Sequence, residues 1–225
     1  MNESVRKKIF QLGKGVKKKI FRYLNNLNTP EFHLSFLDDA GFQECYFIDC
    51  GANNGCSVRK FRNEIDLDNR YHIYSFEPNP AFSDCFDKFE NHTFIPKAVW
   101  TENGKLSFYD SLQNDKYGGT VCDGKSSGNV DYSHPLEVDA INFPSWVMST
   151  FTDKDFIILK LDIEGAEYEV LTKMLMNGSL DKVNLLFIEW HVEKIDVDIK
   201  VHKNLVQALK SRKITPYDWH AAEYI

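Results

Sequence analysis

The stretch FIDCGANNG, residues 47–55, decides the fold that this sequence predicts. It begins with apolar residues typical of a buried strand and then turns at Gly51 and Gly55. An apolar face at helical spacing follows, formed by Val58, Phe61 and Ile65. A strand, a glycine turn and a helix make the nucleotide-cofactor corner of an open α/β sheet. The spacing is D-x-G-x-x-x-G rather than G-x-G-x-x-G, and this difference guides the interpretation of the site.

The bulk composition fits one globular α/β domain, with 225 residues, 43% hydrophobic and 27% charged. No apolar run approaches the roughly 20 residues that span a bilayer. The basic N-terminus leads into no long apolar segment, so no signal peptide is expected. The five cysteines are scattered and form no C-x-x-C pair. They indicate reduced thiols in a cytoplasmic protein rather than a disulfide scaffold.

Charge is distributed unevenly along the chain. Residues 1–22 carry eight lysines and arginines against one glutamate, whereas the whole chain has a net charge of −6, so the remainder is strongly acidic. An acidic body argues against a broad nucleic-acid-binding surface, because contacts to phosphates supply most of that affinity. It does not exclude a small substrate or a glycan.

The N-terminal segment predicts two helices ahead of the main domain. Residues 5–24 repeat apolar side chains at helical spacing with lysines between them, and a second helix is expected from Thr29-Pro30 to Gly41. The first helix suits peripheral contact with a membrane or a protein partner, or simple packing against the domain. We therefore predict an extension over residues 1–42 and a single domain over 43–225.

The rest of the chain alternates strand and helix patterns. Strands are expected at 46–50, 71–76, 93–99, 105–110, 156–161 and 183–188, and helices at 80–90, 144–150, from Gly165 onward and at 199–211. This alternation predicts an open, mainly parallel sheet with helices on both faces. The polar, glycine-rich residues 111–134 form a long loop, which in a compact domain is either functional or disordered.

Acidic residues end four of the predicted strands. They are Asp49, Glu77, Asp162 with Glu164, and Glu189 with His191. Ligands of such sheets bind beyond the carboxyl ends of the strands, where the strand order reverses. We therefore expect these side chains to surround the functional site.

Asp49 stands directly before the glycine turn, where its charge would repel a pyrophosphate. It would attract the cationic amino-acid end of S-adenosylmethionine, although it also suits a plain turn residue. Glu77 follows the next strand and is placed to accept the ribose hydroxyls. Ala98 and Val99 would lie over the adenine, or Val99 would only pack in the core.

Lys160 lies inside a nearly all-apolar strand, where a lysine is costly unless it is paired. Residues two apart in a strand face the same way, so Lys160 and Asp162 point alike. The two interpretations are a buried structural ion pair and a reaction centre that positions a hydroxyl and takes its proton.

Three motifs together resemble the FkbM-type S-adenosylmethionine-dependent methyltransferases. These are the glycine turn at 47–55, the segment FEPN at 76–79 and the segment KLDIEGAE at 160–167. The resemblance implies a class I methyltransferase fold with Rossmann-like topology, and methylation of oxygen on sugars, polyketides or other secondary metabolites. It implies cofactor contacts by Asp49, Gly51, Asn53, Gly55 and Glu77. Ala52, Pro78, Ala98 and Val99 complete the cofactor set that we predict.

A hydroxyl acceptor needs deprotonation as it attacks. We expect His191 as the base, tuned by Glu189 or Glu193, with Asp162 as the second choice. Lys160 and Glu164 belong to the same predicted catalytic cluster. Alternatively, Asp162, Glu164, Glu189 and His191 would ligate Mg²⁺ or Mn²⁺, which would lower the pKa of the hydroxyl.

Two rival functions remain at this point. A lysine–aspartate–glutamate set also suits an RNA ribose 2′-O-methyltransferase, against which the acidic body counts. A non-catalytic module with a cofactor fold, docked by its basic helix, is the other. The acceptor side is expected to involve the 111–134 loop, where Tyr117, Tyr132 and His134 would contact a sugar or remain solvated.

Overall fold

The computed structural model describes residues 41–112, 118–192, 194–195 and 197–219. The two predicted N-terminal helices lie outside the described residues, as do Tyr117 and Glu193. Within the described part of the chain, every helix is too short or too polar to cross a membrane.

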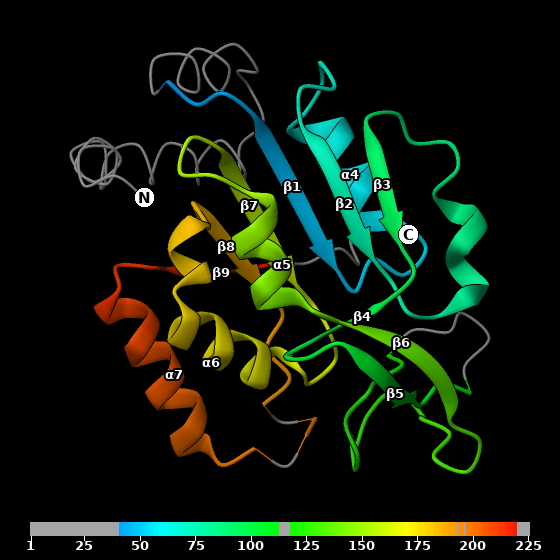
Figure 1. The fold of residues 1–225 in the computed structure, drawn as a ribbon. Helices are drawn as coiled ribbons and strands as arrows, with labels where there is room; N and C mark the ends of the chain where they lie inside the picture. Colours follow the sequence, from blue (N-terminus) through cyan, green and yellow to red (C-terminus); the bar gives the residue numbers. More distant parts are fainter. Residues whose placement is uncertain (1–40, 113–117, 193, 196, 220–225) are drawn as a thin grey trace.

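A six-stranded parallel sheet forms the centre of the fold (Figure 1). Its order is β3-β2-β1-β7-β8-β9. The strands are β1 (Cys45–Cys50), β2 (His72–Phe76), β3 (His92–Ile95), β7 (Phe156–Leu161), β8 (Leu185–Ile188) and β9 (Pro216–Asp218). The chain first builds outward from β1 through β2 to β3 and then returns to place β7 on the other side of β1. The strand order therefore reverses between β1 and β7, which is where sheets of this type bind ligands.

Helices cover both faces of this sheet (Figure 1). The helix α4 (Cys56–Glu64) packs on one face, and α5 (Phe143–Thr150), α6 (Glu167–Asn177) and α7 (Ile199–Ser211) pack on the other. Two short 3-10 helices cover Pro80–Cys85 and Ser179–Lys182. Strands β1 and β7 are buried on both sides, which explains their nearly continuous apolar sequence. This arrangement is the α/β Rossmann-like fold that the sequence predicted.

A second, three-stranded sheet lies beyond the carboxyl ends of β1 and β2 (Figure 1). It has the order β4-β6-β5, with β4 (Ala98–Trp100) parallel and β5 (Gly104–Phe108) antiparallel to β6 (Leu136–Asn142). The prediction of one strand over 93–99 was wrong, because β3 ends at Ile95 and β4 belongs to the other sheet. Pro96 lacks the N–H that a continuing ladder needs, so the chain leaves the main sheet there.

Two further differences concern short elements. The helix expected at 80–90 is a 3-10 helix that ends at Cys85. Ser83, Asp84 and Asp87 favour turns over helix, and Phe86 instead stacks on Phe94 with ring centroids 4.5 Å apart. The strand β9 was not predicted, because three residues are too few to show a period. The other predicted boundaries differ from the structure by about two residues, which is ordinary for element ends.

Candidate active site

A pocket opens at the carboxyl ends of β1, β2 and β7. The main sheet supplies its floor, and the smaller sheet and the glycine-rich loop supply its walls. Most of the predicted cofactor residues line it, namely Gly51, Ala52, Asn53, Glu77, Pro78, Ala98 and Val99. Three of the predicted catalytic residues also line it, namely Lys160, Asp162 and Glu164. The exceptions are Asp49 and Gly55, which lie behind the lining, and His191, which lies deeper.

Geometry explains the glycines of the turn. Gly51 has a φ of 77°, and a Cβ there would lie 1.7 Å from the backbone oxygen of Asp162. Only glycine permits the turn to pass this closely over the end of β7. The N–H groups of Gly51 and Ala52 both donate to the Phe76 carbonyl at 3.0 Å, which fastens the turn to β2. Gly55 has a φ of 78°, and a Cβ there would press on the ring of Phe89.

Glu77 is held rigidly at the edge of the pocket. Its two carboxylate oxygens accept the N–H of Asn53 at 2.9 Å and the N–H of Asn79 at 2.8 Å. Burial raises the pKa of this carboxyl to about 7, although the two backbone donors act in the opposite direction. Each carboxylate oxygen keeps a further lone pair, so the residue can still accept hydrogen bonds from a pair of hydroxyls.

Lys160 connects the turn to the neighbouring strand. Its Nζ lies 2.9 Å from Oδ1 of Asp49, its cross-strand neighbour, and 3.4 Å from Oδ2 of Asp162. The same Nζ donates to the Gly51 carbonyl at 3.0 Å. Burial alone would lower the pKa of Lys160, but the two carboxylates outweigh it and raise the pKa above its ordinary value. Asp49 is fully buried and does not line the pocket, so it acts on the site through Lys160.

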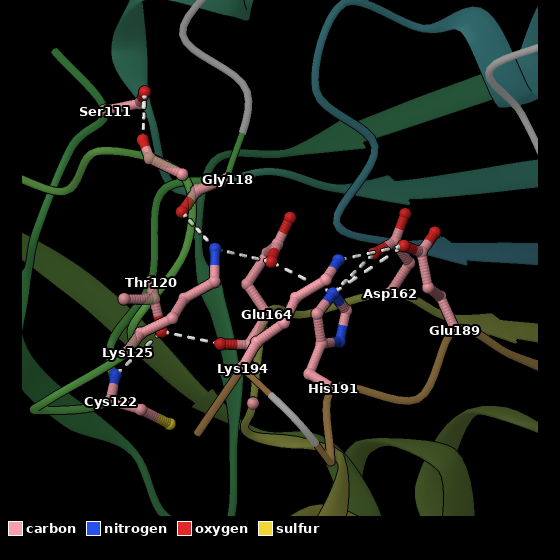
Figure 2. A network of polar contacts seen from close by, with 12 residues as sticks. Ser111, Gly118, Thr120, Cys122, Lys125, Asp162, Glu164, Glu189, His191 and Lys194 are labelled. Atoms are coloured by element: carbon pink, nitrogen blue, oxygen red, sulfur yellow. Dashed lines mark hydrogen bonds and ion pairs between the residues drawn. The ribbon is translucent and has the colours of Figure 1, made fainter. Parts of the chain in front are cut away.

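His191 lies at the centre of a group of carboxylates (Figure 2). Its Nδ1–H donates to Oε1 of the fully buried Glu167 at 3.0 Å. Its Nε2 lies 2.9 Å from Oε2 of Glu164 and 3.8 Å from the nearest oxygens of Asp162 and Glu189. Burial would lower the pKa of His191, but its contacts with Glu164 and Glu167 raise it to about 10. With its pKa raised in this way, the imidazole favours its protonated form at neutral pH and is not a ready base.

Glu167 shapes the turn that carries this group. Its carboxylate accepts the N–H of Ile163 at 2.9 Å and the N–H of Gly165 at 3.0 Å, in addition to the bond from His191. These bonds hold Glu164 at a φ of 55°, a conformation that residues other than glycine rarely adopt. The sequence marked Glu167 only as part of a motif, and its role in positioning became visible from these contacts.

Asp162, Glu164 and His191 could together hold a metal ion, since one ligand atom from each lies within 4.8 Å of the others. Glu189, the fourth ligand that we predicted, is outside this set and lies 3.4 Å from Nζ of Lys194. Two buried atoms in the group, Oε2 of Glu164 and Nε2 of His191, have no well-aligned hydrogen bond to any described residue. Both atoms nevertheless have ion-pair partners, because Oε2 of Glu164 lies 2.9 Å from Nε2 of His191 and 2.7 Å from Nζ of Lys125. A metal ion at this place would have to replace these contacts.

Comparison with known families agrees with this geometry. The model of the methyltransferase FkbM domain matches residues 49–213, which span the glycine turn, the pocket and most of the sheet. The chain belongs to the FkbM methyltransferase family. No curated protein and no solved structure matches the chain.

As an FkbM methyltransferase, the chain uses S-adenosylmethionine, and the pocket suits that cofactor. The backbone of residues 51–54 lines the pocket beside the reaction-centre residues and could meet the methionine end. Glu77 lines the pocket with its carboxylate fixed by two backbone N–H groups, as the prediction of a ribose contact requires. Ala98 and Val99 add apolar side chains to the pocket lining, as the prediction of an adenine contact requires.

The described residues of the glycine-rich loop reach this FkbM pocket, which agrees with the functional one of the two alternatives that its composition left open. Gly118, Gly119, Thr120 and Val121 line the pocket. The hydroxyl of Tyr132 instead accepts the N–H of Lys125 at 2.6 Å, and the exposed His134 contacts Asp131 at 2.9 Å. Lys125, which contacts Glu164, was not predicted as a site residue. Its position between Gly124 and Gly128 is the sequence feature that could have indicated it.

Proposed function

We propose that this FkbM methyltransferase transfers a methyl group to a hydroxyl oxygen of a sugar or another small hydroxyl-bearing metabolite. The observation that carries the proposal is the pair Asp162 and Glu164, which line the pocket just beyond the glycine turn. Carboxylates at that place suit an acceptor that must be oriented and must lose a proton. The acidic character of the chain fits a small acceptor better than RNA.

The cofactor, when bound, supplies a methyl group already activated by its sulfonium, so the protein mainly aligns the acceptor and removes its proton. Oδ1 of Asp162 is the atom that we assign to accept the hydroxyl proton. Its other oxygen, Oδ2, faces Nζ of Lys160 at 3.4 Å, which orients the carboxylate. Because His191 is held protonated by its neighbours, this assignment reverses the order of bases that the sequence favoured.

A metal-assisted version of the same reaction has specific support. One possible ligand atom from each of Asp162, Glu164 and His191 lies within 4.8 Å of the others, which makes a set of three oxygen and nitrogen donors. These donors suit Mg²⁺ or Mn²⁺. A bound divalent ion would lower the pKa of the acceptor hydroxyl and orient it. In that version, the imidazole is a neutral ligand rather than an imidazolium.

Calorimetry with S-adenosylhomocysteine tests the pocket, and we expect binding at one molecule per chain. Failure to bind at about millimolar ligand would overturn the assignment of the pocket. A screen of glycans, small alcohols and short RNAs with methyl-labelled cofactor would then identify the acceptor. Methylation of RNA but not of small hydroxyl compounds would replace our proposal with the ribose alternative.

Substitution of Asp162 separates catalysis from binding. We expect Asp162→Asn to lower kcat by about 10²-fold or more, with affinity for S-adenosylhomocysteine nearly unchanged. Asp139→Asn, at an exposed position of β6, is the matched control and should behave like the wild type. Full activity of Asp162→Asn would remove this residue from the reaction. Treatment with EDTA distinguishes the metal-assisted version, because that version predicts loss of activity and its recovery with Mg²⁺ or Mn²⁺.

A further inference from the structure

Lys125 brings a buried positive charge from the glycine-rich loop to the reaction centre, by which we mean Asp162, Glu164 and His191 (Figure 2). Its side chain is 1% exposed, although it belongs to a polar surface loop. Its Nζ lies 2.7 Å from Oε2 of Glu164 and donates to the Gly118 carbonyl at 2.7 Å. A lysine is rarely buried this completely unless its charge has a partner. The pairing with Glu164 is therefore a specific feature of the site.

The loop backbone is shaped around this ammonium group. Gly118 and Gly128 have φ angles of 87° and 82°, and a Cβ at either position would lie 3.1 Å from Nζ of Lys125. The hydroxyl of Ser111 donates to the Gly128 carbonyl at 2.6 Å and closes the enclosure on that side. The glycines that mark the loop in the sequence thus leave room for a lysine tip.

Further bonds attach the same loop to both sides of the reaction centre, and Figure 2 shows the one made by Thr120. The hydroxyl of Thr120 donates to the backbone carbonyl of Glu164 at 2.7 Å. The N–H of Ser126 donates to the Lys194 carbonyl at 2.6 Å. Because the loop is fixed at both points, the ammonium of Lys125 is delivered to Glu164 at a defined position.

We propose that the ammonium of Lys125 occupies the place of a metal ion in the reaction centre, and that a divalent ion binds there only in competition with it. The contested atom is Oε2 of Glu164, which faces both Nζ of Lys125 and Nε2 of His191 at 2.7 and 2.9 Å. Lys125 is thereby a positioning residue that fixes Glu164 and sets the affinity of the centre for metal. This inference rests on the metal-assisted version of the proposed function.

Two consequences follow from the geometry. With Lys125 in place, the carboxylate of Glu164 is compensated without any external ion. A divalent ion that takes Glu164 as a ligand must repel the ammonium, which then leaves its enclosure between Gly118 and Gly128. The wild-type protein therefore binds divalent ions weakly, and removal of the lysine charge strengthens their binding.

The test compares Mn²⁺ binding, by the electron paramagnetic resonance of free Mn²⁺, in the wild type, Lys125→Met and Lys125→Gln. We expect both variants to bind Mn²⁺ about tenfold more tightly or better, because a unit charge within about 4 Å interacts strongly at protein dielectric. Lys105→Met, which removes an exposed lysine of β5, is the control and should leave the affinity unchanged. Unchanged or weaker Mn²⁺ binding in the Lys125 variants overturns the proposal, since a merely structural lysine would loosen the site.

A second measurement uses the wild-type protein and covers the case in which the variants fail to fold. Lys125 should resist amine acylation without metal, because its side chain is 1% exposed, and should become labelled at saturating Mn²⁺. Lys105, at 58% exposure, serves as the internal standard in the same digest. Protection of Lys125 that Mn²⁺ does not change overturns the proposal. Binding of S-adenosylhomocysteine, measured in the same samples, reports on the proposed function separately.

Discussion

Replacing Lys160 by methionine would leave the carboxylate of Asp49 buried without its partner. The two side chains are 1% and 0% exposed, and their charged atoms lie 2.9 Å apart. Removal of one member of a buried pair costs about 3–5 kcal/mol, because the remaining charge is neither solvated nor compensated. For a domain of this size, a loss of that magnitude lowers the melting temperature by roughly 6–20 °C.

The double variant Lys160→Met with Asp49→Asn separates charge from packing. If the cost of Lys160→Met is the unpaired carboxylate, neutralising Asp49 should recover more than half of the lost stability. Urea unfolding followed by circular dichroism gives the free energy of unfolding for each member of the cycle. The exposed pair of Lys105 and Asp139 is the control, and Lys105→Met should cost less than about 1 kcal/mol.

Two results would refute this reasoning. One is a cost of less than about 1 kcal/mol for Lys160→Met, which would mean that Asp49 is protonated or solvated in the folded protein. The other is a double variant no more stable than the single one, which would place the cost in lost packing of the lysine stem. In either case, the ion pair would not be what holds the glycine turn against β7.

Gly51→Ala should fail to fold or lose cofactor binding, because its Cβ would lie 1.7 Å from the Asp162 carbonyl oxygen; a soluble variant that binds S-adenosylhomocysteine normally contradicts this. Burial raises the pKa of Glu77 to about 7 in the folded protein, so the folded state binds more protons than the unfolded one between the two pKa values. Stability should therefore fall as pH rises from about 4.5 to about 7, and urea titrations should show less of this slope in Glu77→Gln. Glu167→Gln removes one acceptor of a three-bond set and should cost about 1–3 kcal/mol in thermal unfolding, whereas Glu169→Gln on the exposed side of α6 should cost almost nothing.

The sequence predicted the parts of the fold that depend on local pattern. The apolar strands β1 and β7 and the helix α7 were visible because their periodicity extends over enough residues. The family followed from three short motifs that carry the turn and the strand-end acids. The strands β4 and β9 were hidden, because three residues are too few to show a period. That β4, β5 and β6 form a separate sheet was also hidden, because β6 lies about thirty residues beyond its partners along the chain.

Some of the site residues could likewise be predicted from local sequence, whereas the roles of others depended on the tertiary structure. Gly51, Glu77 and Asp162 could be placed from the sequence, because a glycine turn and acids at the ends of parallel strands meet at one edge of the sheet. The roles of Asp49 and His191 could not, since both depend on what buries them. The charge of Lys160 assigns Asp49 to the support of the turn, and surrounding carboxylates keep His191 protonated.

By itself, then, the sequence determined the fold class, the glycine turn and the family, because each depends on short motifs and on the apolar pattern within single strands and helices. Only the tertiary structure decided how the reaction centre is balanced in charge. Lys125 and Glu164 are far apart in the sequence, and no periodicity connects a loop lysine to a strand-end carboxylate. Their contact depends on how the glycine-rich loop folds back over β7, and electrostatic balance in a buried site is set by such distances rather than by sequence spacing.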